Sequence, residues 1–330
     1  MSQTICALIT TTEKNKKLLE QLVSSLCRQT ELVQKVIIIY DGAQRPHRQT
    51  FEDCPIQINW INNRKKESLT YLQNQAVQFM KTDFVLQLND DVVLKDNFIE
   101  ELLMAINKDA AIGMACGKLL RMDKTTIDTA GQLLGKKRTP VERGYGRADI
   151  GQFEQECFVF GSCGAAVLLR KSMLEDCALS ENEYFDKDYN MFYEDFDLSW
   201  RAANFGWKAF YTPKAVGFHA RGTTAKEKEP IFEFLRAYNF AWLKSGLKSD
   251  LIKNRCMTII KNDSFKDFIL NLPHIFIYEL KLFIYCLIFE PKVIGNIFFS
   301  LPLIFSAFKK RANLRKRIKA GKKKIMKECK

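Results

Sequence analysis

The first part of the chain alternates short apolar runs with amphipathic stretches, and this alternation restricts the possible fold more than any other feature. Four runs have the length and composition of buried strands, at residues 4–10, 34–42, 55–61 and 83–88. Amphipathic stretches between these runs predict helices, at 15–29 and 68–80. Alternation of this kind predicts an α/β fold with a mainly parallel central sheet and right-handed crossovers.

Acidic residues follow the fourth apolar run directly. Asn89, Asp90 and Asp91 come after it, and the next helix is expected to be capped by Asp96. Asn and Asp favour turns, so an ordinary turn is one interpretation. In open α/β sheets, however, ligands bind at the carboxyl ends of the strands. Two carboxylates there repel each other, and Mg²⁺ or Mn²⁺ would relieve that repulsion.

The middle of the chain is less periodic. A loop-rich insertion occupies residues 123–153, and residues 157–177 predict a strand, a glycine turn, a second strand and a helix. The turn contains Gly161 and Gly164. Two glycines allow the backbone to approach a ligand closely, and they equally suit an ordinary tight turn.

A second acidic pair opens the helix predicted over residues 194–205. Glu194 and Asp195 lie in its first turn, where an acid stabilises the helix dipole even without another role. His219 lies at the end of a predicted strand further along the chain. A lone histidine is more often structural than a metal ligand, so both interpretations of His219 stay open.

The positive charge of the chain is concentrated at its C-terminus. Residues 309–330 hold twelve Lys or Arg and one acid, Glu328, so they supply +11 of the net charge of +13. The remaining chain is nearly neutral, which argues against a nucleic-acid-binding body.

The segment 265–308 is strongly apolar and aromatic, but charged residues interrupt it and its longest uncharged stretch has 16 residues. A spanning helix needs about 20. We expect helices that lie in a membrane interface, with packing onto the body or a short span as alternatives.

The cysteines and the N-terminus predict a compartment. Ten cysteines are scattered along the chain without a CxxC pair or a zinc spacing. We expect most of them to be reduced and buried, which fits the cytosol. The N-terminal run ICALIT is too short for the apolar region of a signal peptide, so none is expected.

Several stretches together resemble the inverting glycosyltransferases of family 2, which have the GT-A nucleotide-sugar fold, and most closely the bacterial rhamnosyltransferase-type enzymes. The matching pieces are CALITTTEKNKKLLEQLVSSL, VIIIYDG, NQA, LQLNDDVV, GSCGAAVLLRKS and YFDKDYNMFYEDFDLSWRAANFGWKAFYTPKAVGFHARGTT. The last piece is the most specific, because it combines an acidic pair, the pattern EDxDLxxR and a downstream Gly-Trp and His. The resemblance covers roughly residues 1–245.

The resemblance implies a metal and phosphate site. Asp91 resembles the metal ligand of the family's DxD element and would bind the diphosphate through Mg²⁺ or Mn²⁺. Asn89 stands where many members have Asp, and Asp90 would touch the ribose or the donor sugar. His219 resembles a second metal or diphosphate contact.

The resemblance also implies a nucleotide pocket and a base. Thr10, Thr11 and Asp41 resemble the residues that hold the nucleotide base. Asp195 resembles the general base that takes the proton of the acceptor hydroxyl, with Glu194 as the alternative carboxylate. One base and one displacement give inversion, so no covalent nucleophile is required.

The implied protein is a metal-dependent inverting glycosyltransferase. Its partners would be a nucleotide-diphosphate sugar donor, a glycan or lipid-linked glycan acceptor and an anionic membrane surface, on the cytoplasmic face of the inner membrane. We expect a GT-A domain at 1–228, a helical membrane-associating region at 229–308 and a polybasic tail at 309–330.

Three rival interpretations remain. A processive polysaccharide synthase usually has a QxxRW element, whereas this chain has SWRAA. A sugar-nucleotide pyrophosphorylase has a Gly-rich N-terminal loop, whereas LITTTEKNKK contains no glycine. The third rival is a catalytically inactive, membrane-associated scaffold, against which the retained Asp91 and Asp195 count.

Overall fold

A computed structural model describes residues 3–12, 15–42, 54–221 and 245–328 of the protein, with side chains up to residue 318. Its strands are β1 Ile5–Thr12, β2 Lys35–Asp41, β3 Gln57–Asn62, β4 Phe84–Asn89, β5 Val92–Leu94, β6 Ile112–Arg121, β7 Ile127–Thr129, β8 Gln132–Leu134, β9 Pro140–Glu142, β10 Cys157–Val159, β11 Ala166–Arg170 and β12 Lys208–His219. Its helices are α1 Lys16–Cys27, α2 Leu69–Gln78, α3 Phe98–Ile106, α4 Lys171–Cys177, α5 Glu194–Phe205, α6 Ser245–Asn262, α7 Phe265–Phe289, α8 Pro291–Phe299 and α9 Leu301–Glu328.

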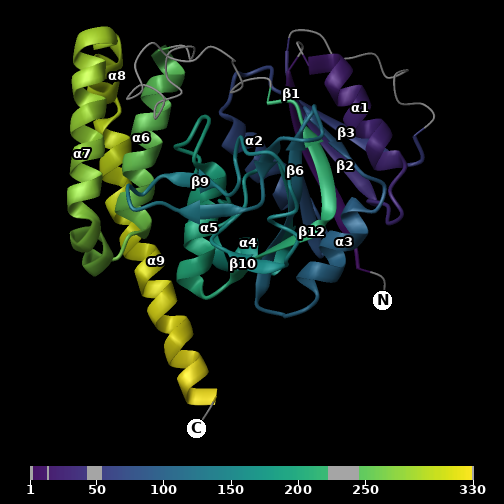
Figure 1. Ribbon diagram of the computed structural model, residues 1–330. Helices are drawn as coiled ribbons and strands as arrows, with labels where there is room; N and C mark the ends of the chain where they lie inside the picture. The colour runs from purple at the N-terminus through teal and green to yellow at the C-terminus, as the bar shows by residue number, and fades with distance from the viewer. Residues whose placement is uncertain (1–2, 13–14, 43–53, 222–244, 329–330) are drawn as a thin grey trace.

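The central sheet has the strand order β10-β12-β6-β11-β4-β1-β2-β3 (Figure 1). Strands β1, β2, β3, β4, β6 and β12 run in one direction, whereas β10 and β11 run antiparallel to their neighbours. Parallel neighbours need crossover connections, which α1 and α2 help to supply here. The α/β fold with a mainly parallel sheet, predicted from the sequence, is confirmed.

Both faces of the sheet are covered, as β1 illustrates. Ile5, Ala7 and Ile9 belong to the core beneath α1 and α3. Cys6 and Leu8 point to the opposite face and join the core beneath α2, α4 and α5. Successive side chains of a strand alternate between faces, so a strand buried on both sides must be apolar throughout. This explains why β1, β2 and β4 were recognisable as apolar runs, whereas the edge strand β3 is half-exposed and mixes polar with apolar residues.

The start of α3 differs from the prediction. The residue that precedes the first helical turn is Asn97, not Asp96, and its side chain makes no capping hydrogen bond. Asp96 is exposed and forms an ion pair with Arg28 at 3.6 Å. The acidic first turn of α3, with Glu100 and Glu101, stabilises the helix through its dipole instead.

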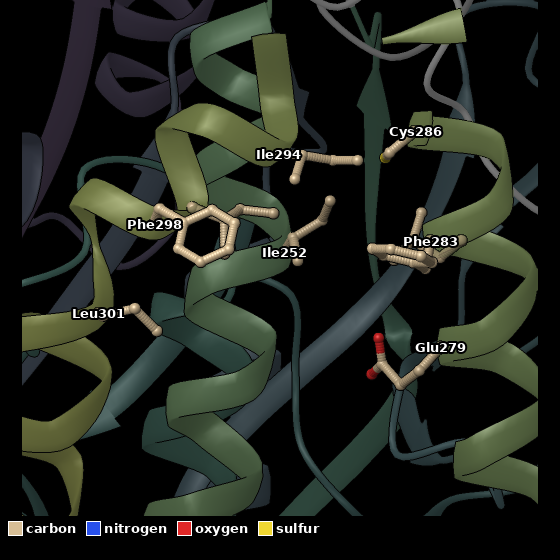
Figure 2. A pocket seen from close by; sticks show the side chains of 9 residues that line it. Ile252, Glu279, Phe283, Cys286, Ile294, Phe298 and Leu301 are labelled. Atoms are coloured by element: carbon tan, nitrogen blue, oxygen red, sulfur yellow. The ribbon is translucent and has the colours of Figure 1, made fainter. Parts of the chain in front are cut away.

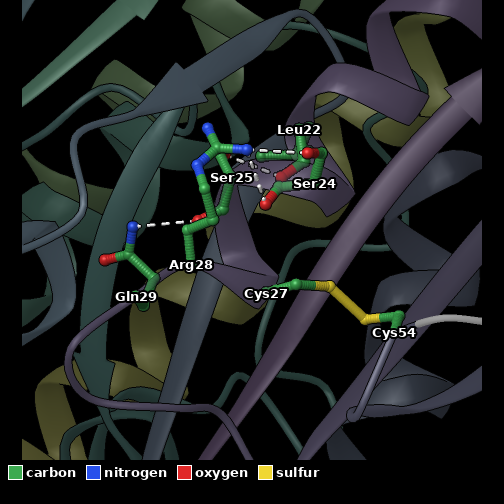
Figure 3. Close-up of a disulfide and its surroundings, with 7 residues drawn as sticks. All are labelled: Leu22, Ser24, Ser25, Cys27, Arg28, Gln29 and Cys54. Carbon is green, nitrogen blue, oxygen red and sulfur yellow. Dashed lines mark hydrogen bonds between the residues drawn. A yellow bond between two sulfur atoms is a disulfide. The ribbon is translucent and has the colours of Figure 1, made fainter.

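Two cysteines differ from the expectation of reduced thiols. Cys27, the last residue of α1, is joined by a disulfide to Cys54, just before β3 (Figure 3). The other cysteines within the described residues are free. A separation of 27 residues carries no motif, because the fold rather than the local sequence brings the two sulfur atoms together.

The helices α6–α9, residues 245–328, form an appendage on the side of the sheet domain away from α1 (Figure 1). Helix α7 is long and apolar enough to cross a bilayer, and α8 with the first part of α9, bent by 51°, would count as a second such helix. Length and composition alone support this, and buried core helices can pass the same criteria. Large apolar side chains of α7 are exposed, at Phe265, Ile269, Leu270, Leu272, Phe276, Ile277, Leu280, Phe283, Ile284, Leu287, Ile288 and Phe289.

A cavity of about 340 Å³ lies within the appendage, between α6, α7, α8 and the start of α9 (Figure 2). Ile252, Phe283 and Phe298 line it, and its one charged lining residue is Glu279. Glu279 forms an ion pair with Arg255 of α6. The four helices therefore leave apolar side chains accessible between them as well as on the outer face of α7.

The basic segment 309–330 was expected to face a membrane. Its first residues instead pack against the protein, and Lys310 contacts the sheet domain. Lys310 is mostly buried and forms ion pairs with Asp186 and, at 2.8 Å, with Asp188. Arg311, by contrast, bonds within the appendage, where it donates a hydrogen bond of 2.7 Å to the carbonyl oxygen of Asp263, just after α6. Helix α9 also continues from Leu301 to Glu328 without a break at residue 308.

A fully buried group of charges fastens α5 to the appendage. Asp197 of α5 accepts hydrogen bonds from Arg201 Nε at 2.9 Å and from Asn262 Nδ2 at 2.8 Å. Lys261 Nζ lies 2.9 Å from the same carboxylate and also pairs with Asp186. A buried charge is stable only when it is paired and hydrogen-bonded. Asp197 therefore determines how α5 and α6 pack.

We expect Asp197→Ala to lower the free energy of unfolding by about 3–5 kcal/mol, because it leaves buried cationic donors without their acceptor. Urea denaturation of the full chain measures this. Asp96→Ala is the matched control, since it removes one member of an exposed pair and should leave the midpoint nearly unchanged. Equal midpoints for the two variants would contradict the importance of the buried group.

Candidate active site

The carboxyl ends of β1, β2 and β4 lie side by side. Within the sheet, Thr10 pairs with Asn89 and Thr12 pairs with Asp41. Thr11 is buried, whereas the exposed Asp41 accepts a hydrogen bond of 3.3 Å from Asn63 Nδ2. The structure therefore brings the predicted nucleotide-pocket residues together at one edge of the sheet, the edge where ligands bind in such folds.

Asp90 lies just beyond the end of β4 and is buried. Its Oδ1 accepts a hydrogen bond of 3.1 Å from Asn15 Nδ2. Burial raises the pKa of Asp90, and hydrogen bonds from Thr11 and Asn15 oppose that rise. Asp90 thus links the end of β4 to the start of α1, on the nucleotide-pocket side of the edge.

Asp91 and His219 converge because β5 pairs with the end of β12. His219 pairs with Val92 in that ladder, and the amide of Ala220 donates to the carbonyl oxygen of Asp91 at 2.9 Å. These backbone contacts place His219 Nε2 3.1 Å from Asp91 Oδ1. The opposite ring nitrogen, Nδ1, lies 2.8 Å from Asp128 Oδ2 of β7.

The histidine stands between two carboxylates, and this decides its charge. Burial alone would lower the pKa of His219, but hydrogen bonds with Asp128 and Asp91 raise it to about 9. Burial likewise opposes ionisation of Asp128, yet His219 and Arg221 hold its pKa below the usual range. The site therefore favours a positive charge between the two carboxylates.

The donor set at Asp91 and His219 fits a divalent metal ion once His219 Nε2 has lost its proton, because a protonated ring nitrogen has no lone pair for the metal. A carboxylate oxygen suits Mg²⁺ and Mn²⁺, whereas an imidazole nitrogen suits transition metals better than Mg²⁺. Asp128 orients the ring through Nδ1, as the outer partner of a metal-bound histidine commonly does. Within the described residues no group of three or more His, Cys, Asp or Glu forms a complete metal site. Phosphate oxygens and water would have to supply the remaining ligands.

Asp195 lies beside the same edge, at the start of α5. Its Oδ2 accepts a hydrogen bond of 2.9 Å from the backbone amide of Gly164. The next residue, Ala165, accepts a hydrogen bond of 2.9 Å from the amide of Asn89. Two adjacent residues of one turn therefore connect the base candidate to the end of β4.

The glycines of that turn lie close to neighbouring elements, Gly161 to α5 and Gly164 to β4. A Cβ atom on Gly164 would lie 2.8 Å from Gln87 Nε2, and one on Gly161 would lie 2.3 Å from Ser199 Oγ of α5. Neither position has a left-handed backbone. Gly161 allows α5 to pack closely against the turn, and Asp195 at the start of α5 then lies within reach of the Gly164 amide.

The chain enters α5 through an unusual backbone conformation. Phe192 and Tyr193 have φ angles of 71° and 70°, in the left-handed region. For residues with a Cβ atom this conformation costs about 1–2 kcal/mol each. Such conformations persist only where the surroundings enforce them, and they are concentrated at functional sites.

The two carboxylates that open α5 differ in environment. Burial, and then repulsion by Asp195, raises the pKa of Glu194 to about 8, and Glu194 Oε2 has no hydrogen-bond partner in the described part of the chain. Burial also raises the pKa of Asp195, but hydrogen bonds from the amides of Gly164 and Phe196 oppose that rise. Asp195 is therefore the one that ionises first and can accept a proton near neutral pH.

The insertion at 123–153 supplies site residues that the sequence did not reveal. Gln132 Nε2 of β8 donates to Asp195 Oδ2 at 3.3 Å and to Glu142 Oε1 at 2.9 Å. Burial raises the pKa of Glu142 to about 7. With Asp128, these residues come from strands only three residues long, too short to show a period. In the sequence, Asp128 in IDT and Glu142 in PVE stand out only as acids beside an apolar residue, and Gln132 does not stand out at all.

A model of the family described as Glycosyltransferase like family 2 matches residues 3–245. No curated protein sequence matches the chain.

Two solved structures are similar in fold. The crystal structure of GalNAc-T7 with UDP, GalNAc and Mn²⁺ aligns with a TM-score of 0.58 and 12% identity, over 78% of this chain and 48% of that one. The crystal structure of S. aureus TarS aligns with a TM-score of 0.49 and 11% identity, over 79% of this chain and 40% of that one. The chain therefore spans less than half of each of these proteins. The likeness to GalNAc-T7 supports the GT-A fold.

Proposed function

Because the chain belongs to the family Glycosyltransferase like family 2, we propose that it transfers a sugar from a nucleotide-diphosphate donor to a hydroxyl group of a glycan or lipid-linked glycan. One observation carries the proposal: Asp91, with His219 3.1 Å away, and the amide-bound Asp195 are both connected to the end of β4. Asp91 and His219 are suited to bind a metal ion that carries the diphosphate, and Asp195 is suited to accept a proton from the acceptor hydroxyl.

Each group has a chemical role in this proposal. Thr10, Thr11 and Asp41 would hold the nucleotide, and Asp90 the ribose or the donor sugar. Asp91 and His219 would hold Mn²⁺ in preference to Mg²⁺, because the donor set contains an imidazole. When bound, the metal ion would neutralise charge that develops on the leaving diphosphate. The solved GalNAc-T7 structure, which contains Mn²⁺ and UDP, is consistent with this choice.

Asp195 would act as the general base. Its carboxylate is oriented by the amides of Gly164 and Phe196, at 2.9 Å and 2.7 Å. It would take the proton of the acceptor hydroxyl as that oxygen forms its bond to the anomeric carbon and the bond to the diphosphate breaks. A single displacement inverts the anomeric carbon. The resemblance of LQLNDDVV and the long segment ending in GFHARGTT supports a rhamnosyltransferase-like subtype.

Metal-dependent hydrolysis of nucleotide sugars tests the enzyme against the inactive scaffold. We expect the full-length protein to release nucleoside diphosphate from one member of a donor panel when Mn²⁺ is present. Asp91→Ala should abolish this release and weaken Mn²⁺-dependent nucleotide binding. Asp195→Asn should lower kcat by about 10²-fold or more while leaving donor affinity unchanged, because it removes basicity and preserves shape.

Glu194→Gln is the matched control for the base, since it changes the adjacent carboxylate. Its loss of activity should be smaller than that of Asp195→Asn. Because the pKa of Asp195 is raised, kcat should decline as the pH falls through a value above the usual range of an aspartate. Near-normal turnover of Asp91→Ala, or a dead Glu194→Gln with an active Asp195→Asn, would refute these assignments.

We also propose that the appendage binds the cytoplasmic face of an anionic membrane. The exposed apolar side chains of α7 would enter the interface, and basic residues of 309–330 beyond Arg311 would attract the anionic headgroups. This arrangement suits a lipid-linked acceptor, whose sugar would lie near the membrane surface.

Sedimentation with vesicles tests this proposal. The full-length protein should pellet with anionic vesicles at low salt and less at high salt, because salt screens the charge attraction. Phe276→Asp, at an exposed position of α7, should reduce pelleting severalfold. Phe79→Asp is the control, since Phe79 is exposed on the sheet domain far from the appendage in sequence. Protein that stays in the supernatant with anionic vesicles at low salt would contradict membrane binding.

A further inference from the structure

Helix α6 presents a row of polar side chains to the segment that leads into α5. Asn254, Thr258 and Asn262 are spaced four residues apart, so they share one face of the helix. Thr258 Oγ1 lies 2.7 Å from the hydroxyl of Tyr189, and Asn262 Nδ2 donates to Asp197 at 2.8 Å. The three side chains therefore contact the chain between Tyr189 and the first turn of α5.

Asn254, at one end of this row, makes the contact with the left-handed turn. It is fully buried, and its Nδ2 donates to the carbonyl oxygens of Met191 and Phe192, both at 2.9 Å. One side-chain amide thus binds two consecutive peptide groups. The second of them joins Phe192 to Tyr193, the two residues with left-handed backbones. Asn254 is placed to hold the orientation of these peptides.

This orientation determines where the acidic pair lies. Glu194 follows Tyr193 directly, and the first backbone hydrogen bond of the helix runs from the amide of Asp197 to the carbonyl oxygen of Tyr193 at 2.8 Å. Phe192 and Tyr193 would otherwise prefer a right-handed or extended backbone. A change of either φ angle would swing Asp195 away from the Gly164 amide.

Apolar packing supports the same turn but does not fix the peptides. Tyr193, Phe196 and Trp200 pack with Met257 of α6 and Ala307 of α9. Such contacts are non-directional. The hydrogen bond from Asn254 to each of the two carbonyl oxygens, by contrast, restrains the orientation of that peptide group.

We propose that Asn254 is a positioning residue for the base, and that the appendage thereby completes the active site of the sheet domain. This inference rests on the proposed role of Asp195. Asn254 touches neither donor nor acceptor. It acts by holding Phe192 and Tyr193 in the left-handed conformation, from which Asp195 reaches the Gly164 amide.

The test uses Asn254→Leu, which keeps the size of the side chain and removes both donated hydrogen bonds. Asn204→Ala is the matched control. Asn204 lies in the same α5–α6 interface and donates one hydrogen bond of 3.0 Å to the carbonyl oxygen of Asn262, at the other end of the row. Both full-length variants are assayed for Mn²⁺-dependent release of nucleoside diphosphate, with the donor that the wild-type protein hydrolyses fastest.

Asn254→Leu should lower kcat at least tenfold and leave KM for the donor within about twofold, because misplacement of a base affects the chemical step. Asn204→Ala should leave both constants near wild type. A second substitution separates positioning from general stability. Glycine adopts positive φ without strain, so Asn254→Leu should cost less activity in a Phe192→Gly background than in the wild type.

An equal fall in kcat for Asn204→Ala, a change confined to KM, or no relief by Phe192→Gly would overturn the proposal. If the wild-type protein hydrolyses no donor in the panel, the proposed function fails, and hydrogen exchange then decides the structural claim alone. Asn254→Leu should speed amide exchange at residues 194–197 at least tenfold, whereas Asn204→Ala should not. Unchanged exchange at residues 194–197 in Asn254→Leu would overturn the positioning role.

Discussion

Several carboxylates are buried at the carboxyl edge of the sheet and in the adjacent helix α5. The way in which strands and helices pack around that edge depends on how these carboxylates are paired. An ionised carboxylate is stable away from water only if cations or hydrogen-bond donors surround it. Asp197 is matched by Arg201 and Lys261, and Asp128 by His219 and Arg221. The partners come from different elements, so each buried acid fixes two or three elements relative to one another.

The partners of each buried acid distinguish structural carboxylates from carboxylates that can exchange a proton. Asp197 and Asp128 each form ion pairs with cationic side chains. Asp195 is held mainly by backbone amides, which orient a carboxylate without neutralising it, and its pKa is raised. Glu194 and Glu142 lie in less compensated surroundings, where burial raises their pKa to about 8 and about 7. Neighbouring carboxylates thus receive different protonation states from environment alone.

The sequence predicted those parts of the fold whose physical signal is local. Strands β1, β2 and β4 are buried on both faces and therefore mostly apolar, and acids stand at the end of β2 and directly after β4. The edge strand β3 is half-exposed and mixes polar with apolar residues. The pairing of Asp91 with His219 was reachable only through the family resemblance, because it depends on the ladder between β5 and β12. Partners such as Gln132 and Asn254 gave no local signal, since each acts on residues more than sixty positions away.

The appendage shows why position along the chain is a poor guide to role. Its apolar composition and basic end suggested a membrane-associating module, with packing onto the body as an alternative. Yet Met257 and Ala307 complete the core around Phe196, Lys261 and Lys310 pair with Asp186, and Asn262 reaches Asp197. Deleting the appendage would leave these buried groups unmatched, so loss of activity on truncation would not by itself show a need for a membrane. Only substitutions on the outer face of α7, which leave the inner contacts intact, can separate membrane binding from support of α5.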